Sequence, residues 1–235
     1  MAKLFEGAVR DWKFVLLFCI FSLLFWLSEF AYQLYYTQNP NAVGALVRSF
    51  AFSSATFISL SLLSSAVFRF RPALLKYWKV RRILGVTGAF FMALHVLAVL
   101  LFVFGGDIFK VFYSLNPLEN PLIFGAIALP IFLLVALIST DWAVQKLGAK
   151  WKAIQRLVYP GFLLIVFHFL LTNPPALLEI PGFLLLGISA LALLGELFWF
   201  IADARQKSFC SKGTALGAAL ILLYVIIAYL AYFKK

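Results

Sequence analysis

The sequence predicts an all-α protein, a polytopic integral membrane helical bundle with six to seven transmembrane helices. Three observations support this prediction. Hydrophobic residues make up 64% of the 235 positions and charged residues only 12%, whereas soluble domains carry about 25% charged residues. The apolar residues form long runs without the alternation that membrane β-strands show. The basic residues gather in alternate connections between these runs.

Seven apolar runs are long enough to cross a bilayer as helices. They cover approximately residues 14–35, 49–68, 83–104, 122–138, 157–172, 182–201 and 215–233. The first run exceeds a signal-peptide core and lacks a cleavage site of small residues, so we expect a retained anchor. The fourth and fifth runs are short, and the fifth is expected to begin about one turn earlier, within 151–156. Because the connections are short, we expect a single transmembrane domain over 1–235.

The net charge of +11 would suggest a nucleic-acid partner in a soluble domain. Here 16 of the 20 lysines and arginines fall at the N-terminus and in the connections after the second, fourth and sixth runs. The positive-inside rule therefore places these segments and the N-terminus in the cytoplasm. The expected partner is the lipid bilayer, with no nucleic acid. No phosphate-binding glycine loop or zinc-type cysteine cluster is present, so flavin or nucleotide chemistry is expected in another polypeptide.

The chain contains two histidines, His95 and His168, and both lie in apolar runs. The third and fifth predicted helices run in the same direction. At about 1.5 Å per residue, His95 lies about 18 Å from the helix start at Ile83, and His168 lies about 17 Å from Leu157. Ionisable residues within a membrane indicate function. Haem iron takes two axial imidazoles, whereas zinc needs three or four protein ligands, so the pair predicts one haem with bis-histidine ligation.

A glycine lies two helical turns before each histidine, Gly88 before His95 and Gly161 before His168. On the same helix face, these glycines would leave room for a porphyrin edge. Two alternatives are open. Each histidine could hydrogen-bond a neighbouring helix, and each glycine could serve close helix packing alone. The matched depth of the two histidines favours haem.

Several motifs resemble those of a known family. Ser-Thr-x-Trp at 139–142, Leu-Gly at 147–148 and Trp-Lys-Ala-Ile-Gln-Arg-Leu-Val-Tyr at 151–159 precede His168. Arg-Arg-Ile-Leu-Gly at 81–85 precedes Leu94 and His95, and Asn39-Pro40 leads to Arg48. Over about residues 35–172, this pattern resembles the ferric-reductase-like transmembrane family. Within it, the pattern is similar to the branch of haem-binding membrane subunits of periplasmic methionine sulfoxide reductase systems.

This resemblance implies a b-type haem protein of the bacterial inner membrane. Such a protein carries electrons from quinol or a cytoplasmic flavin reductase to an outer acceptor, either a periplasmic reductase or ferric iron. His95 and His168 match the family's histidines on the third and fifth helices. The family has a further histidine where this chain has Gln155, and Arg81 and Arg82 occupy the matching level of the third helix. Glutamine is a poor iron ligand, so the sequence does not support a second haem.

A single haem beyond the midplane leaves a gap to a soluble cytoplasmic donor, because the apolar layer is about 30 Å thick. A quinol bound in the membrane would remove this gap, and we favour quinol as the donor. Alternatively, Arg81, Arg82 and Gln155 could hold a second cofactor at the inner face. Arg48 could pair with a haem propionate, since its guanidinium matches carboxylate geometry. No residue is assigned a catalytic role.

The main alternative is a non-redox membrane protein, either a small-solute transporter or an assembly factor that retains the fold. The missing histidine at Gln155 and the additional run at 215–233 support this alternative. Weakly held haem would indicate a third function, transient haem handling. Glu29 and Glu196 lie within predicted helices, where they could relay protons, orient a quinol headgroup or be hydrated at an interface.

Overall fold

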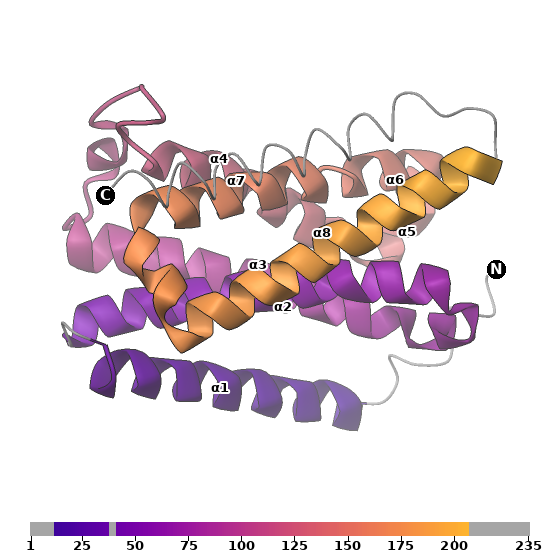
Figure 1. Ribbon diagram of the computed structural model, residues 1–235, viewed down its shortest axis with the longest axis horizontal. Coiled ribbons are helices and arrows are strands. Elements are labelled where there is room, and N and C mark those ends of the chain that lie inside the picture. The colour runs from indigo at the N-terminus through magenta and orange to yellow at the C-terminus, as the bar shows by residue number, and fades with distance from the viewer. Residues whose placement is uncertain (1–11, 38–40, 207–235) are drawn as a thin grey trace.

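A computed structural model of the protein describes residues 12–37 and 41–206, which form a helical bundle (Figure 1). Its long helices are α1 (Trp12–Tyr35), α2 (Ala42–Phe70), α3 (Trp78–Ala98), α4 (Leu122–Leu137), α7 (Val158–Thr172) and α8 (Ile180–Gln206). Short helices connect them: η2 (Pro72–Tyr77), η3 (Val99–Val103), η4 (Ile108–Phe112), α5 (Asp141–Leu147), α6 (Ala149–Gln155) and η5 (Pro174–Leu178). The described residues contain no strand, and the predicted all-α class is confirmed.

Five helical segments are long and apolar enough to cross a membrane, and a sixth crossing results if α4 and α5 form one span. The predicted multi-pass membrane bundle is thus confirmed. The fifth predicted run corresponds to a segment over Lys150–Thr172, which confirms its expected earlier start. Helix α4 turns by 91° into α5, where Thr140 caps α5 by accepting a hydrogen bond from the Ala143 amide (3.2 Å). The predicted seventh run, 215–233, lies outside the described residues.

The second span is longer than its apolar run suggested. Helix α2 begins at Ala42 rather than near 49, because Asn41 caps it by accepting a hydrogen bond from the Gly44 amide (2.5 Å). At 29 residues, α2 is about 44 Å long. It therefore reaches both ends of the bundle and packs against α1, α3 and α8. No other described helix contacts so many neighbours extensively, so α2 is the central helix.

The bundle has two chemically different ends (Figure 1). We call one the basic end, because α2 finishes there, α3 begins there and the cation-rich segments 69–82 and 146–156 meet there. The other is the long-loop end, where segment 104–121 joins η3 to α4. Most large side chains on the lipid-facing side of α1 are exposed, such as Leu17 (68%) and Leu24 (60%). An exposed apolar surface of this kind matches contact with lipid rather than water.

Serines allow the close approach of α2 to its neighbours. Ser54 donates a hydrogen bond to the Gly88 carbonyl of α3 (2.9 Å), and the Ser59 hydroxyl lies 3.0 Å from that of Ser189 on α8. Ser61 donates to the Arg81 carbonyl (2.9 Å). Small hydroxyl side chains let helix backbones approach closely in membranes and hydrogen-bond across the contact. The apolar core around this contact is formed by Ile58, Leu62, Ala89, Met92, Ala128, Phe132, Phe162, Val166, Leu170 and Ala192.

Candidate functional site

The structure brings the two sequence-predicted histidines together. His95 lies near the end of α3 and His168 near the end of α7, and both are partly buried. Their ring centres are 6.3 Å apart, with an angle of 66° between the ring planes. Because both helices end at the long-loop end, the pair lies closer to that end than to the basic end.

Each histidine is oriented by a backbone carbonyl of another element. The Nδ1 atom of His95 lies 2.9 Å from the carbonyl oxygen of Val47 on α2, and that of His168 lies 3.1 Å from the carbonyl oxygen of Pro121. A carbonyl oxygen can only accept a hydrogen bond, so Nδ1 carries the proton in both rings. This tautomer leaves the lone pair of each Nε2 for a ligand. Neither Nε2 has a hydrogen bond to another part of the described chain.

The separation of the two rings fits a single metal between them. If each metal–nitrogen bond is about 2 Å and each ring centre lies about 1 Å behind its ligating nitrogen, two imidazoles on opposite sides of one iron have centres about 6 Å apart. The observed value is 6.3 Å. The part of the chain described contains no group of three or more His, Cys, Asp or Glu residues that could complete a zinc site. The residues present therefore fit the axial ligation of haem.

The glycine next to this pair is one that the sequence analysis overlooked. A Cβ added at Gly125 of α4 would lie 3.2 Å from Nδ1 and 3.3 Å from Cε1 of His168. This is closer than most real Cβ contacts, so a larger residue would push the imidazole away from its present position. Gly125 follows Pro121 by one helical turn, and the Pro121 carbonyl and Gly125 both face the His168 ring. This spacing was the signal available in the sequence.

The structure gives Gly88 and Gly161 a role in helix packing, the alternative that the sequence left open. A Cβ at Gly88 would lie 2.6 Å from the Ile58 side chain and 3.1 Å from the Ser54 carbonyl oxygen, both on α2. A Cβ at Gly161 would lie 2.9 Å from the Phe132 ring of α4. Both glycines are buried where helices touch, so they permit close packing of α3 on α2 and of α7 on α4.

Two predicted arginines also have protein partners. Arg48 donates to the Gly44 carbonyl (3.4 Å) and to the Thr37 hydroxyl (3.3 Å), which links the start of α2 to the end of α1. Arg82 forms an ion pair with Asp141 of α5 (2.6 Å). Arg82 therefore connects α3 to the α4–α5 bend, and it also lines a pocket at the basic end.

Asn120 organises the long loop beside His168, which the sequence analysis did not anticipate. Its side chain is fully buried and donates to the carbonyls of Val111 (2.8 Å) and Ser114 (2.9 Å). The next residue is Pro121, whose carbonyl faces His168. In the structure, Asn120 also fixes the acceptor that orients one histidine.

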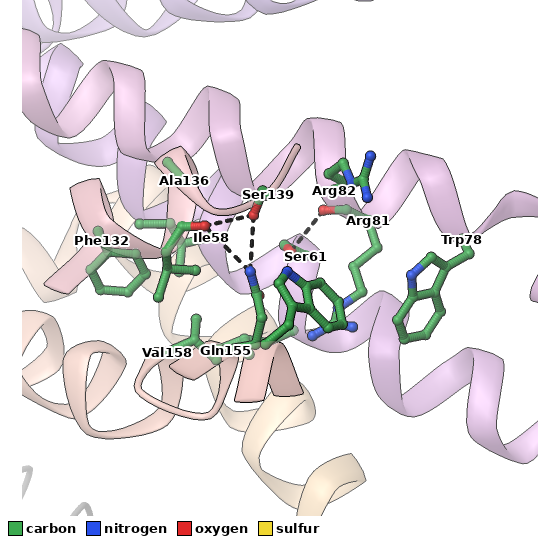
Figure 2. Close-up of a pocket in the computed structure, with 14 residues that line it drawn as sticks. Ile58, Ser61, Trp78, Arg81, Arg82, Phe132, Ala136, Ser139, Gln155 and Val158 are labelled. Carbon is green, nitrogen blue, oxygen red and sulfur yellow. Dashed lines mark hydrogen bonds between the residues drawn. The ribbon is translucent and has the colours of Figure 1, made fainter. Parts of the chain in front are cut away.

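A separate, partly open pocket of about 50 Å³ lies at the basic end (Figure 2). We call it the basic-end pocket. Its polar side is formed by Ser61, Arg81, Ser139 and Gln155, with the indoles of Trp78 and Trp151. Figure 2 shows Arg81 extending toward the Gln155 side of the pocket, whereas Arg82 points away. Arg81, Arg82 and Gln155, which the sequence analysis considered together, therefore line one pocket, away from the two histidines.

The two membrane carboxylates have different surroundings. Glu196 of α8 forms an ion pair with Arg69 of α2 and accepts a hydrogen bond from the Tyr159 hydroxyl (3.0 Å). Glu29 of α1 accepts a hydrogen bond from Gln33 Nε2 (2.9 Å). Both carboxylates are buried, so the alternative that they are simply hydrated at an interface is wrong. Neither carboxylate lines the basic-end pocket.

Comparisons with known proteins identify the family of this chain. The family model described as ferric reductase like transmembrane component matches residues 47–166. The chain is 29% identical over 166 residues to the protein-methionine-sulfoxide reductase heme-binding subunit MsrQ of Bordetella pertussis, and the match covers 69% of this chain and 76% of that protein. The MsrQ proteins of Bordetella parapertussis and Bordetella bronchiseptica match equally. No solved structure matches. The family model covers His95, both glycine contacts and the basic-end pocket, and it ends two residues before His168. The chain belongs to the ferric reductase like transmembrane component family.

Proposed function

We propose that this protein is a membrane electron-transfer subunit that holds one b-type haem between His95 and His168. The observation that carries the proposal is the 6.3 Å separation of two imidazoles whose Nδ1 atoms both face backbone carbonyls. The curated relatives are named heme-binding subunits, which supports the same cofactor. The family match over residues 47–166 supports the same class of protein.

The protein's own residues would hold and tune this cofactor. Haem supplies an iron centre that takes up and releases one electron at a time. The carbonyls of Val47 and Pro121 keep each Nδ1 protonated and each Nε2 available, and such hydrogen bonds raise the basicity of the ligand. Arg48 follows Val47 directly, and we propose it as the partner of a haem propionate. Its two hydrogen bonds to protein oxygens are long, at 3.3 and 3.4 Å, so it can exchange them for a carboxylate.

The charge distribution supports a direction for the electrons. By the positive-inside rule, the basic end and the N-terminus face the cytoplasm, and the long-loop end faces the outside of the bacterial inner membrane. His95 and His168 lie toward the long-loop end, so the electron acceptor is outside, either a periplasmic reductase partner or ferric iron. The donor is a quinol or a cytoplasmic flavin reductase. The names of the relatives, subunits of a methionine sulfoxide reductase, support a protein acceptor.

The visible spectrum of the purified protein, produced with haem supplied, tests this function. We expect a Soret band and one haem per chain, and both should be lost in His95→Ala and His168→Ala. Leu97→Ala is the matched control, because Leu97 lies two residues from His95 on the same helix but is 50% exposed on its surface. A wild-type protein without a Soret band would refute the proposal, as would histidine variants that retain the full haem content.

A further inference from the structure

We infer that the loop over residues 104–121 inserts into the lipid leaflet at the long-loop end, through an apolar face of its own. We call this surface the apolar loop face. It consists of six exposed side chains: Ile108, Phe109, Phe112, Tyr113, Leu115 and Leu118. The inference adds a lipid contact outside the spanning helices, and it does not depend on the proposed haem.

The first step is the direction of the loop. The spanning segment before it ends at Val103, and two consecutive glycines follow, Gly105 (φ 64°) and Gly106 (φ 85°). Glycine adopts a positive φ without steric clash, so the chain turns sharply at this point. Figure 1 shows the loop projecting sideways from the bundle, next to the beginning of α4. The loop therefore lies at the depth where the spanning helices end, which is the boundary between hydrocarbon and headgroups.

The second step is that the polar groups of the loop bind one another. Each of its three charged side chains has a hydrogen-bond partner within the loop. These pairs are Asp107 with the Phe109 amide (3.0 Å), Lys110 with the Phe104 carbonyl (3.3 Å) and Glu119 with the Ser114 hydroxyl (2.8 Å). The Tyr113 hydroxyl donates to the Glu119 carbonyl (2.8 Å), so the exposed ring has its polar atom satisfied. Near lipid, polar groups need internal partners of this kind.

The third step is continuity with the lipid-facing surface of the bundle. Leu101, Phe102 and Val103 are each more than half exposed at the end of a spanning segment, and the apolar loop face begins five residues later. Phe109 (81%) and Leu115 (80%) are more exposed than any other large apolar side chain in the part of the chain described. Aromatic residues gather where hydrocarbon meets headgroups. The lipid that covers the end of η3 therefore extends over the loop.

A protein partner matches the apolar loop face less well. Protein interfaces have a polar rim, and their charged groups steer the partners and fix their register. The charged side chains of this loop are instead engaged by the loop itself. Six apolar side chains beside a spanning segment, without a free charge directed to a partner, match insertion into a lipid interface.

Insertion links the membrane to the histidine site. Asn120 donates hydrogen bonds to the Val111 and Ser114 carbonyls within the loop. The next residue is Pro121, whose carbonyl faces His168. A loop that lipid holds at one depth therefore also holds this carbonyl in place.

Spin labels at single cysteines test the insertion in vesicles of an equimolar mixture of phosphatidylethanolamine and phosphatidylglycerol. The two native cysteines, Cys19 and Cys210, are first changed to serine in the full chain. Labels are then attached in Phe109→Cys and in Leu115→Cys. We expect molecular oxygen, which concentrates in lipid, to reach both labels better than a water-soluble nickel chelate. Leu101→Cys provides the lipid-facing reference, because Leu101 is exposed within a spanning segment.

Asn116→Cys is the matched control, because Asn116 is an exposed polar residue that directly follows Leu115. Its label should show the opposite preference, for the nickel chelate. Labels at Phe109 and Leu115 that behave like the label at Asn116 would overturn the inference. Protection of both labels from both reagents would also overturn it, because another protein chain would then cover the apolar loop face.

Hydrogen exchange in the same vesicles provides a second measurement without labels. Phe109→Asp should make the amides of residues 108–118 exchange about ten-fold faster, because a large aromatic side chain no longer holds the loop on the lipid. Asn116→Asp adds the same charge nearby and should leave the exchange unchanged. Equal exchange in the two variants and the wild-type protein would contradict the inference.

The test is independent of the proposed function. The label in Leu115→Cys should keep its preference for oxygen when His95→Ala and His168→Ala are added. A wild-type protein without haem would therefore refute the proposed function and leave the insertion of the loop intact. Conversely, water-exposed labels in a protein with a normal Soret band would overturn the insertion alone.

Discussion

The two ends of the bundle place different polar groups between the same four helices, α2, α3, α4 and α7. Toward the long-loop end, His95 and His168 face each other, and backbone carbonyls fix both tautomers. At the basic end, the corresponding level holds Arg81 and Gln155, neither of which ligates iron well. In the function proposed above, one helical frame presents a metal site at one depth and a separate polar pocket at another. The side chains, rather than the frame, decide which ligand each depth accepts.

The largest expected effect separates ligation from packing at the histidine site. His168→Gly should lose the Soret band completely, because one axial ligand is gone. Added imidazole should restore it, since the space left by the side chain lies between the Pro121 carbonyl and the opposing His95. The measurement is a titration of the variant with imidazole, with Leu97→Gly as the control. Absence of rescue in a folded variant would argue against axial ligation by His168.

A smaller effect is expected from the loop that supports the same histidine. Asn120→Ala removes two buried hydrogen bonds that hold the loop before Pro121. Supporting residues of this kind change metal affinity by about 10–100-fold, so haem transfer to apomyoglobin should accelerate and the reduction potential should shift. Asn116→Ala is the matched control, because exposed Asn116 accepts only the Leu118 amide through its side chain. Equal behaviour of the two variants would show that Asn120 does not position His168.

The next prediction concerns the packing of α3 on α2, two helices that extend between both ends of the bundle, and it is tested by substituting Gly88. Gly88→Ala should lower the free energy of unfolding by about 1–3 kcal/mol, because the new methyl group would overpack the α2–α3 contact. Gly187→Ala makes the same chemical change on α8, where a Cβ meets nothing within 4 Å. Thermal unfolding in detergent compares the two. If Gly88 borders a porphyrin instead, haem affinity should fall with little change in the unfolding temperature.

The smallest effect is expected when the basic-end pocket is made more like the histidine site. Gln155→His introduces an imidazole at the last residue of α6, just before α7, which carries His168. No lining residue opposite it can serve as a second axial ligand, so the ratio of haem to chain should remain one. Pyridine haemochrome analysis measures this ratio. A second haem in this variant would show that one ligand is sufficient at the basic end.

The sequence was most informative where a chemical type was rare in its setting. Only two histidines occur in the chain, and both lie in apolar runs, so their depth along the helices was enough to predict that they meet. It was least informative for glycine and arginine. Gly88 and Gly161 permit helix contacts, and Arg82 pairs with Asp141, 59 positions away. The partners of these residues come from other helices, and the spacing along one helix cannot reveal them.

The amino-acid sequence by itself determined the membrane class, the approximate spans and the level of each histidine, because hydropathy and the helical rise act along the chain. The tertiary structure decided which carbonyls orient the imidazoles, which glycines lie between helices and which arginine pairs with Asp141. It also decided that α2, with its serines, is the central helix. These features depend on the packing of segments that are distant in sequence, where hydrogen-bond geometry and close contact set the chemistry of each side chain.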